Sequence, residues 1–168
     1  MSLGLKPVQY LEMLNAEYEE YKKNSLSMRK VITCCALSNA MPEIVFAEYG
    51  STEPQKVHGA NDHGAYRRHL RGECEAHHTV RDICDFSKHG PVLGRQKPEV
   101  PAALRVSMRD AKHIIRQEGI FRGLLAITQI QEIERLVITH EDGREQPIGE
   151  VLAQAIKSWE MIFKRDRL

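Results

Sequence analysis

An arginine and a histidine near the middle of the chain are the side chains whose types could support catalysis. Arg81 and His89 lie in the stretch HHTVRDICDFSKHG, which has the spacing of a helix. A histidine exchanges protons near neutral pH, and an arginine stabilises negative charge on a phosphate. His89 could therefore exchange a proton with a ribose hydroxyl or a leaving oxygen, and Arg81 could stabilise charge on a phosphate.

The same two residues also have a structural interpretation. Eight positions on one helix separate them by about 12 Å along its axis, and a dimer could bring them closer. Arg81 can pair with Asp85 four residues further on, and Lys88 and His89 suit the negative end of a helix. We favour this structural interpretation over the catalytic one.

Histidines and cysteines gather in the same part of the chain. Six of the eight histidines lie between positions 58 and 89, together with two of the four cysteines. Cys74 and His78 are about one helical turn apart and could bind zinc with ligands from the segment between His58 and His69. Thiols are more often small buried apolar groups, and most histidines lie at the surface. The sequence therefore favours neither a metal nor a cofactor.

Basic residues near these histidines could contact RNA. The candidates are Arg67 and Arg68 and, in the Pro- and Gly-rich segment that follows, Arg95 and Lys97. Acidic residues are interspersed with them, and the whole chain has 24 Lys and Arg against 23 Asp and Glu. Strong binding to a nucleic acid needs several uncompensated cations on one face. A protein partner is therefore favoured, with RNA as the alternative.

Several large classes of protein are disfavoured by what the sequence lacks. It contains no GxxxxGK[ST], GxGxxG, GxSxG or HExxH motif. The cysteines include no CxxC, and the first residues do not resemble a signal peptide, so we expect reduced thiols and a cytoplasmic protein. The most apolar run, from Val31 to Gly50, is interrupted by polar residues and by Pro42. It predicts a core helix rather than a membrane span.

The chain is expected to form a single domain, 1–168, with helices over positions 7–90. Apolar periodicity predicts one helix from Pro7 and a second from Ser25 or Ser27 to Gly50, kinked or restarted at Pro42. Further helical segments should reach position 90, with Gly72 as a possible break. Positions 91–103 then form a Pro- and Gly-rich connection.

The C-terminal part, 104–168, changes to a pattern typical of strands. The pair Asp142-Gly143, after LVITHE, is the strongest hairpin signal in the chain, and IFRGLLAI could add a third strand. Apolar residues at helical spacing then predict a closing helix. The predicted fold is mainly α (α+β), a bundle of four to five helices with a C-terminal β-hairpin and a closing helix.

Long antiparallel helices with an Arg and a downstream Lys-His pair near the end of a later helix resemble the HEPN superfamily of prokaryotic helical proteins. The resemblance covers roughly positions 7–90. It implies, as in the ribonuclease members, a metal-independent RNA-cleaving site made of an Arg and a nearby His, usually assembled across a dimer. Here that pair would be Arg81 and His89, although Arg71 and His77 keep the closer spacing of the family. Many HEPN-like proteins serve instead as partners or ligand-binding modules.

Two functions from different classes remain open at this point. We favour a non-catalytic cytosolic protein, an accessory component of a bacterial or phage system, that binds a protein partner or forms a homodimer. The alternative is a HEPN-like metal-independent ribonuclease that uses Arg81 and His89. The tyrosines of the first helix, Tyr10, Tyr18 and Tyr21, should either continue the core or form a two-fold interface.

Overall fold

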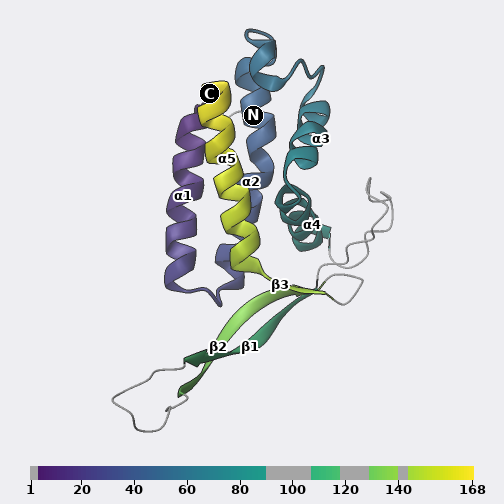
Figure 1. Cartoon of the computed structure of the whole chain (residues 1–168). Coiled ribbons are helices and arrows are strands. Elements are labelled where there is room, and N and C mark those ends of the chain that lie inside the picture. Colours follow the sequence, from purple (N-terminus) through teal and green to yellow (C-terminus); the bar gives the residue numbers. More distant parts are fainter. Residues whose placement is uncertain (1–3, 90–106, 118–128, 140–143) are drawn as a thin grey trace.

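The computed structural model describes residues 4–89, 107–117, 129–139 and 144–168. Helices α1, α2 and α5 lie side by side, α3 and α4 flank α2, and a β-ribbon extends from one end of the bundle (Figure 1). The predicted fold class, a helical bundle with a hairpin and a closing helix, is confirmed. The elements are, in order, α1 Pro7–Lys23, α2 Met28–Tyr49, the 3-10 helix η1 Pro54–Val57, α3 His63–Glu73, α4 Ala76–His89, β1 Ser107–Gln117, β2 Gln129–Thr139, β3 Glu145–Pro147 and α5 Ile148–Asp166.

Helices α1 and α2 begin where the sequence predicts. Pro7 is the first residue of α1, where its missing N–H costs no helical hydrogen bond. Ser27 caps α2, because its side chain accepts a hydrogen bond from the backbone N–H of Lys30. The expected restart at Pro42 is wrong, since α2 is one continuous helix with Pro42 buried inside it, and the alternative of a kink stays a prediction. Packing against α1, α3, α4 and α5 offsets the backbone hydrogen bond that proline removes.

The break between α3 and α4 falls two residues later than Gly72. Gly72 lies within α3, at an exposed position that tolerates a glycine at a cost of about 1 kcal/mol. The chain leaves the helix at Cys74, whose backbone is extended while its N–H still bonds to the carbonyl of Leu70 at 3.1 Å. The new helix begins at Ala76, so the segment from His77 onward is in α4.

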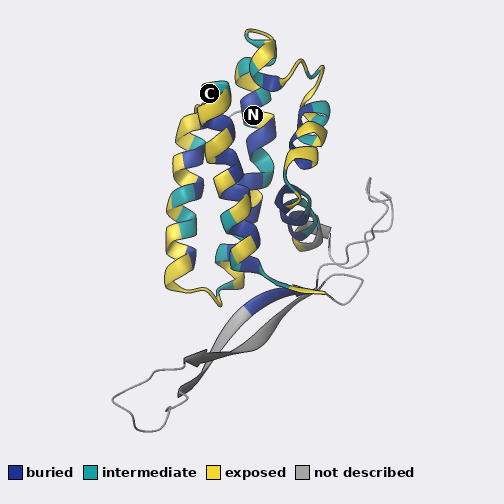
Figure 2. Ribbon diagram, viewed as in Figure 1, coloured by how far each residue is buried: buried dark blue, intermediate teal, exposed yellow. Residues whose placement is uncertain are grey.

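The core is formed where the helices face one another, and Figure 2 shows their buried sides turned inward. Trp159 of α5 is fully buried at its centre and donates a hydrogen bond from Nε1 to Oγ of Ser38, at 3.2 Å. Tyr21 is buried and stacks on Tyr18, so this part of the first helix continues the core. Other fully buried side chains are Leu14, Val31, Met41, Val45, Tyr66, Ile138, Ile148 and Leu152.

Helix α2 is long and apolar enough to cross a membrane by length and composition alone, with a mean hydropathy of 1.3 over its most apolar window. The same helix runs through the middle of the bundle and contacts the four other α-helices. Its buried residues include Val31, Cys34, Met41 and Val45. The core helix of a globular protein passes the same test. Packing in the bundle accounts for the apolar character of α2.

The ribbon is made of two long antiparallel strands. β1 pairs with β2 over eleven residues, from Ser107 opposite Thr139 to Gln117 opposite Gln129, and β3 pairs with the end of β2. β2 and β3 therefore flank the predicted Asp142-Gly143 turn. The turn itself, the stretch IFRGLLAI and the connection 91–103 lie outside the described residues. β1 is a strand that the sequence analysis did not predict.

Candidate functional site

The predicted catalytic pair lies on one helix, α4. Arg81 is half-buried, and its Nε lies 3.3 Å from Oδ2 of Asp85, the pairing that the structural interpretation predicts. His89 is the last residue of α4, and its side chain is outside the described part of the structure. The catalytic role of Arg81 and His89 therefore stays a prediction.

The residues with the closer HEPN-like spacing, Arg71 and His77, both lie in the interior. Nε2 of His77 is 3.0 Å from Oγ of Ser158, and its ring packs edge-on against Trp159. Burial lowers the pKa of His77 from its usual value to about 4. The imidazole is therefore neutral at pH 7 and belongs to a buried polar contact between α4 and α5.

The predicted nucleic-acid residues are partly described. Arg67 donates hydrogen bonds to Oε1 of Glu43, at 2.8 Å, and to the carbonyl of Asn39, at 3.2 Å. Its charge is thus balanced by a carboxylate of α2. Arg68 is exposed, and Arg95 and Lys97 lie outside the described residues. Binding of a nucleic acid by these residues stays a prediction.

A small recess lies between α2, α3 and α4. Its volume is about 10 Å³, which is about enough for one water molecule. An organic substrate needs a pocket at least an order of magnitude larger. The recess is therefore no site for such a substrate. Its walls are formed by Ser38, Asn39, Pro42, Arg67, Leu70, Arg71, His77 and Val80.

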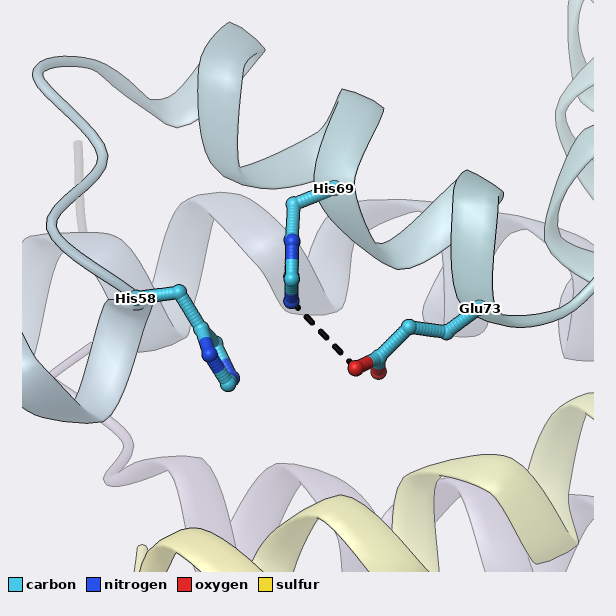
Figure 3. Close-up of side chains that lie close together, drawn as sticks. All are labelled: His58, His69 and Glu73. Carbon is cyan, nitrogen blue, oxygen red and sulfur yellow. Dashed lines mark ion pairs between the residues drawn. The ribbon is translucent and has the colours of Figure 1, made fainter.

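Among the described residues, one group of three side chains has the composition and spacing of a metal site. His58, His69 and Glu73, here called the histidine cluster, offer ligand atoms that all lie within 4.8 Å of one another. Figure 3 shows the three side chains pointing toward a common space beside α5. His69 and Glu73 are one turn apart on α3, with Nε2 and Oε1 3.3 Å apart, and His58 follows η1.

The end of α5 supplies two charged residues to the cluster. Arg165 donates from NH1 to Oε1 of Glu73 at 2.8 Å, and its NH2 lies 2.9 Å from Nε2 of His58. Oδ2 of Asp166 is 3.2 Å from the same nitrogen. Burial alone would raise the pKa of Glu73, but the hydrogen bond and charge of Arg165 lower it below the usual value. The carboxylate of Glu73 is therefore ionised beside the positive charge of Arg165.

The zinc alternative of the sequence analysis was based on Cys74 and His78, with help from the segment between His58 and His69. In the described residues, the group that could hold an ion contains His58 and His69 but neither Cys74 nor His78. Cys74 ends α3, and His78 is half-buried in α4. The sequence could have indicated Glu73 as a further ligand, because it follows His69 by four residues and so lies on the same face of a helix.

Comparisons with known proteins yield no relative. No protein-family model matches the chain, and neither the curated proteins nor the solved structures contain a match. The likeness to the HEPN superfamily therefore stays a resemblance.

Proposed function

We propose that the protein is a non-catalytic cytoplasmic binding protein, and that its β1–β2 ribbon joins it to a second copy of itself. The observation that carries this proposal is the ribbon, which extends away from the bundle (Figure 1). Leu136, Val137 and Ile138, at the base of the ribbon, are buried. A two-stranded hairpin is at best marginally stable in water without further packing. A ribbon of eleven-residue strands therefore calls for a partner along its length.

The outer edge of β1 is where such a partner would add. Within the described residues, the sheet order is β1-β2-β3, so β1 has a neighbouring strand on one side. The N–H and C=O groups on the other side form a template for a further strand. Alternation also places apolar positions on both faces of β1, Met108 and Ile114 on one and Ala111 and Ile115 on the other. A partner that continues the sheet would extend both faces.

Part of the β1 sequence is complementary to itself when two copies run antiparallel. With Ala111 on the two-fold axis, Asp110 of each copy lies opposite Lys112 of the other. Met108 of each copy then lies opposite Ile114 of the other. Pairs of unlike charges and of apolar residues each stabilise a sheet by about 0.2–1 kcal/mol. The resulting sheet, with the strand order β3-β2-β1-β1-β2-β3, contains each favourable pair twice.

The charge of the ribbon fits a protein partner better than a nucleic acid. β1 and β2 together carry four basic residues against three acidic ones, so they lack the uncompensated cations that phosphate binding needs. The small recess and the Arg81–Asp85 pair also support a function other than catalysis. All four cysteines are free, which agrees with a reducing compartment.

Cross-linking at the proposed axis tests the dimer directly. In an Ala111→Cys variant, the two new cysteines would be opposite each other, at about 4.5–5.5 Å between Cα atoms, within reach of a disulfide. Ser107→Cys is the matched control, because its two copies would lie about 26 Å apart along the strands. Cys74 is replaced by Ser in both variants, since the other native cysteines are buried. We expect an oxidised dimer for Ala111→Cys and a monomer for Ser107→Cys.

Light scattering on the unmodified protein supplies a second, independent readout. We expect twice the chain mass at micromolar concentration, and a single-chain mass for Asp110→Lys, which would place lysines opposite lysines across the axis. Glu12→Lys, an exposed acidic residue of α1, is the control and should remain dimeric. Circular dichroism confirms that each variant keeps its helices. A monomeric wild-type protein at high concentration would reject the proposal, as would equal cross-linking of both cysteine variants.

A further inference from the structure

We propose that His58, His69 and Glu73 bind a transition-metal dication of the zinc type, with Asp166 orienting His58. The donors come from two elements, since His58 follows η1 while His69 and Glu73 lie on one face of α3. Two imidazoles and a carboxylate suit zinc and its neighbours, whereas magnesium and calcium prefer oxygen ligands. This site is independent of the ribbon and of dimer formation.

The spacing of the donor atoms requires a small adjustment. Bonds of about 2.1 Å in a tetrahedral zinc site place the ligand atoms about 3.4 Å apart. The cluster atoms lie within 4.8 Å of one another, and Nε2 of His69 and Oε1 of Glu73 are already 3.3 Å apart. The side chains of His58, His69 and Glu73 are 29%, 39% and 30% exposed. The rings of His58 and His69 are stacked, with centroids 4.1 Å apart, so one ring must also turn for both to present a nitrogen to the same ion. The partial exposure of the side chains leaves room for this movement.

Arg165 shows that a cation is already favoured at this place. Its guanidinium bonds to Glu73 and lies against His58, but its side chain is 46% exposed and has a long flexible stem. It also bonds to Asp166, from Nε to Oδ1 at 2.7 Å and from NH2 to Oδ2 at 2.9 Å. A dication would replace the single positive charge of the Arg165 guanidinium with two positive charges. Arg165 would then turn toward water.

The contacts of His58 support this exchange. Nε2 of His58 lies close to both Oδ2 of Asp166 and NH2 of Arg165. A hydrogen bond to Asp166 requires a proton on Nε2, whereas a hydrogen bond from Arg165 requires the lone pair of Nε2. One nitrogen satisfies one of these roles at a time. If Nδ1 binds the metal, Nε2–H donates to Asp166, the carboxylate–histidine–metal arrangement common in metal sites. Departure of Arg165 thus removes the conflict.

A further observation points to the same place. The hydroxyl of Tyr66 is buried without a hydrogen-bond partner, and burial together with the nearby charge of Asp166 raises the pKa of this tyrosine. A polar ligand of the ion would give that hydroxyl a partner.

Cobalt binding tests the proposal with a spectroscopic readout. The protein, freed of any purification tag and stripped with EDTA, is titrated with cobalt(II) and followed by the visible d–d absorption of the bound ion, and zinc then displaces the cobalt. We expect one ion per chain. His69→Ala and Glu73→Gln should each weaken binding by about tenfold or more. His63→Ala, an exposed histidine of α3 outside the cluster, should bind as the wild type does.

Two more variants separate metal ligation from a structural role and from the cysteine alternative. Arg165→Ala removes the competing cation and should bind the ion more tightly, an effect that mere loss of structure would not produce. Cys74→Ser should leave binding unchanged, with no thiolate-to-cobalt charge-transfer band in either protein. A band that disappears in Cys74→Ser would place the ion at Cys74 and overturn the proposal. So would no uptake of cobalt, or uptake unaffected by His69→Ala and Glu73→Gln in folded variants.

Discussion

Trp159 is fully buried in the helical bundle, whereas β1 and β2, among the described residues, have mainly each other for neighbours. In the bundle, side chains far apart in the sequence fill a common interior, and the polar groups of His77 and Trp159 find partners there. In the ribbon, backbone pairing follows a regular register, with buried positions at the base. Within the described residues, the chain thus contains one part that is closed on itself and one part in which the outer edge of β1 has no neighbouring strand.

This difference concerns where each region obtains its stability. Burial of apolar surface stabilises the bundle within one chain, at about 25 cal/mol per Å² removed from water. Pairing of two strands supplies little by itself, so the ribbon depends on what packs against it. Changes in the bundle should therefore alter the free energy of unfolding. Changes in the ribbon should alter association instead.

The largest expected effect is the loss of Trp159. Trp159→Ala removes the largest fully buried side chain and its hydrogen bond to Ser38, so we expect the free energy of unfolding to fall by about 3–5 kcal/mol. Urea unfolding followed by circular dichroism measures the change. Met161→Ala, two residues along α5 and 57% exposed, should cost about 0.5 kcal/mol or less. Equal losses in the two variants would mean that α5 is not packed as described.

The buried His77 predicts a dependence of bundle stability on pH. Its pKa is about 4 in the folded protein and about 6.5 in the unfolded chain, so the unfolded state binds more protons between these values. The free energy of unfolding should therefore fall as the pH is lowered from about 6.5 to 4, by up to about 3 kcal/mol from this residue. Urea unfolding at several pH values measures the slope.

Asp82 acts in the opposite direction over part of this range. Burial raises the pKa of Asp82 to about 6. The contribution of this carboxyl to the free energy of unfolding therefore increases as the pH falls through that value. The contribution of His77 is therefore isolated by His77→Gln, which keeps a polar group for Ser158 but does not titrate. The variant should lose less stability than the wild type between pH 6.5 and 4. Parallel curves for the two proteins would contradict a neutral buried His77.

Shortening the ribbon should separate stability from association. In a shortened variant, positions 112–134 are replaced by an Asn-Gly turn. This variant keeps the strand pairing at the base of the ribbon, from Met108↔Ile138 to Ala111↔Arg135. Because the bundle core is untouched, its free energy of unfolding, measured by the fluorescence of Trp159 at low protein concentration, should change by about 0.5 kcal/mol or less. Light scattering should show a monomer. A large loss of stability in the monomer would mean that the ribbon is part of the bundle core.

The sequence predicted the elements whose signals are local. Pro7, Ser27 and Gly50 mark the ends of α1 and α2 through their own chemistry. The continuity of α2 through Pro42 depended on neighbouring helices, which no local pattern reveals. β1 was missed because SMRDAKHIIRQ lacks a clear alternation and its partner strand comes after a further segment of chain. Strand pairing of this kind is decided by tertiary context.

The histidine cluster could likewise be predicted only in part from the sequence. The spacing of His69 and Glu73 could be read from the sequence, and His58 belonged to the segment already noted for its histidines. Arg165 and Asp166 follow Glu73 by more than ninety residues in the sequence. They contact Glu73 and His58 because α5 packs beside this segment. Local spacing can therefore suggest ligands, but the fold decides which of them meet.

The smallest expected effect concerns Arg81, the residue on which the ribonuclease alternative depends. If the role of Arg81 is to form a surface ion pair on α4, Arg81→Ala removes its ion pair with Asp85 and should lower the free energy of unfolding by about 0.3–0.5 kcal/mol. Incubation of the wild type and this variant with end-labelled RNA in EDTA should then give no cleavage by either. Cleavage that Arg81→Ala and His89→Ala both abolish, with intact folding, would instead make α4 a catalytic element. Because Arg81→Ala changes the free energy of unfolding so little, a loss of RNA cleavage in this variant would reflect the chemistry of Arg81 rather than the packing of α4. The least disruptive substitution therefore distinguishes most clearly between a binding protein and a ribonuclease.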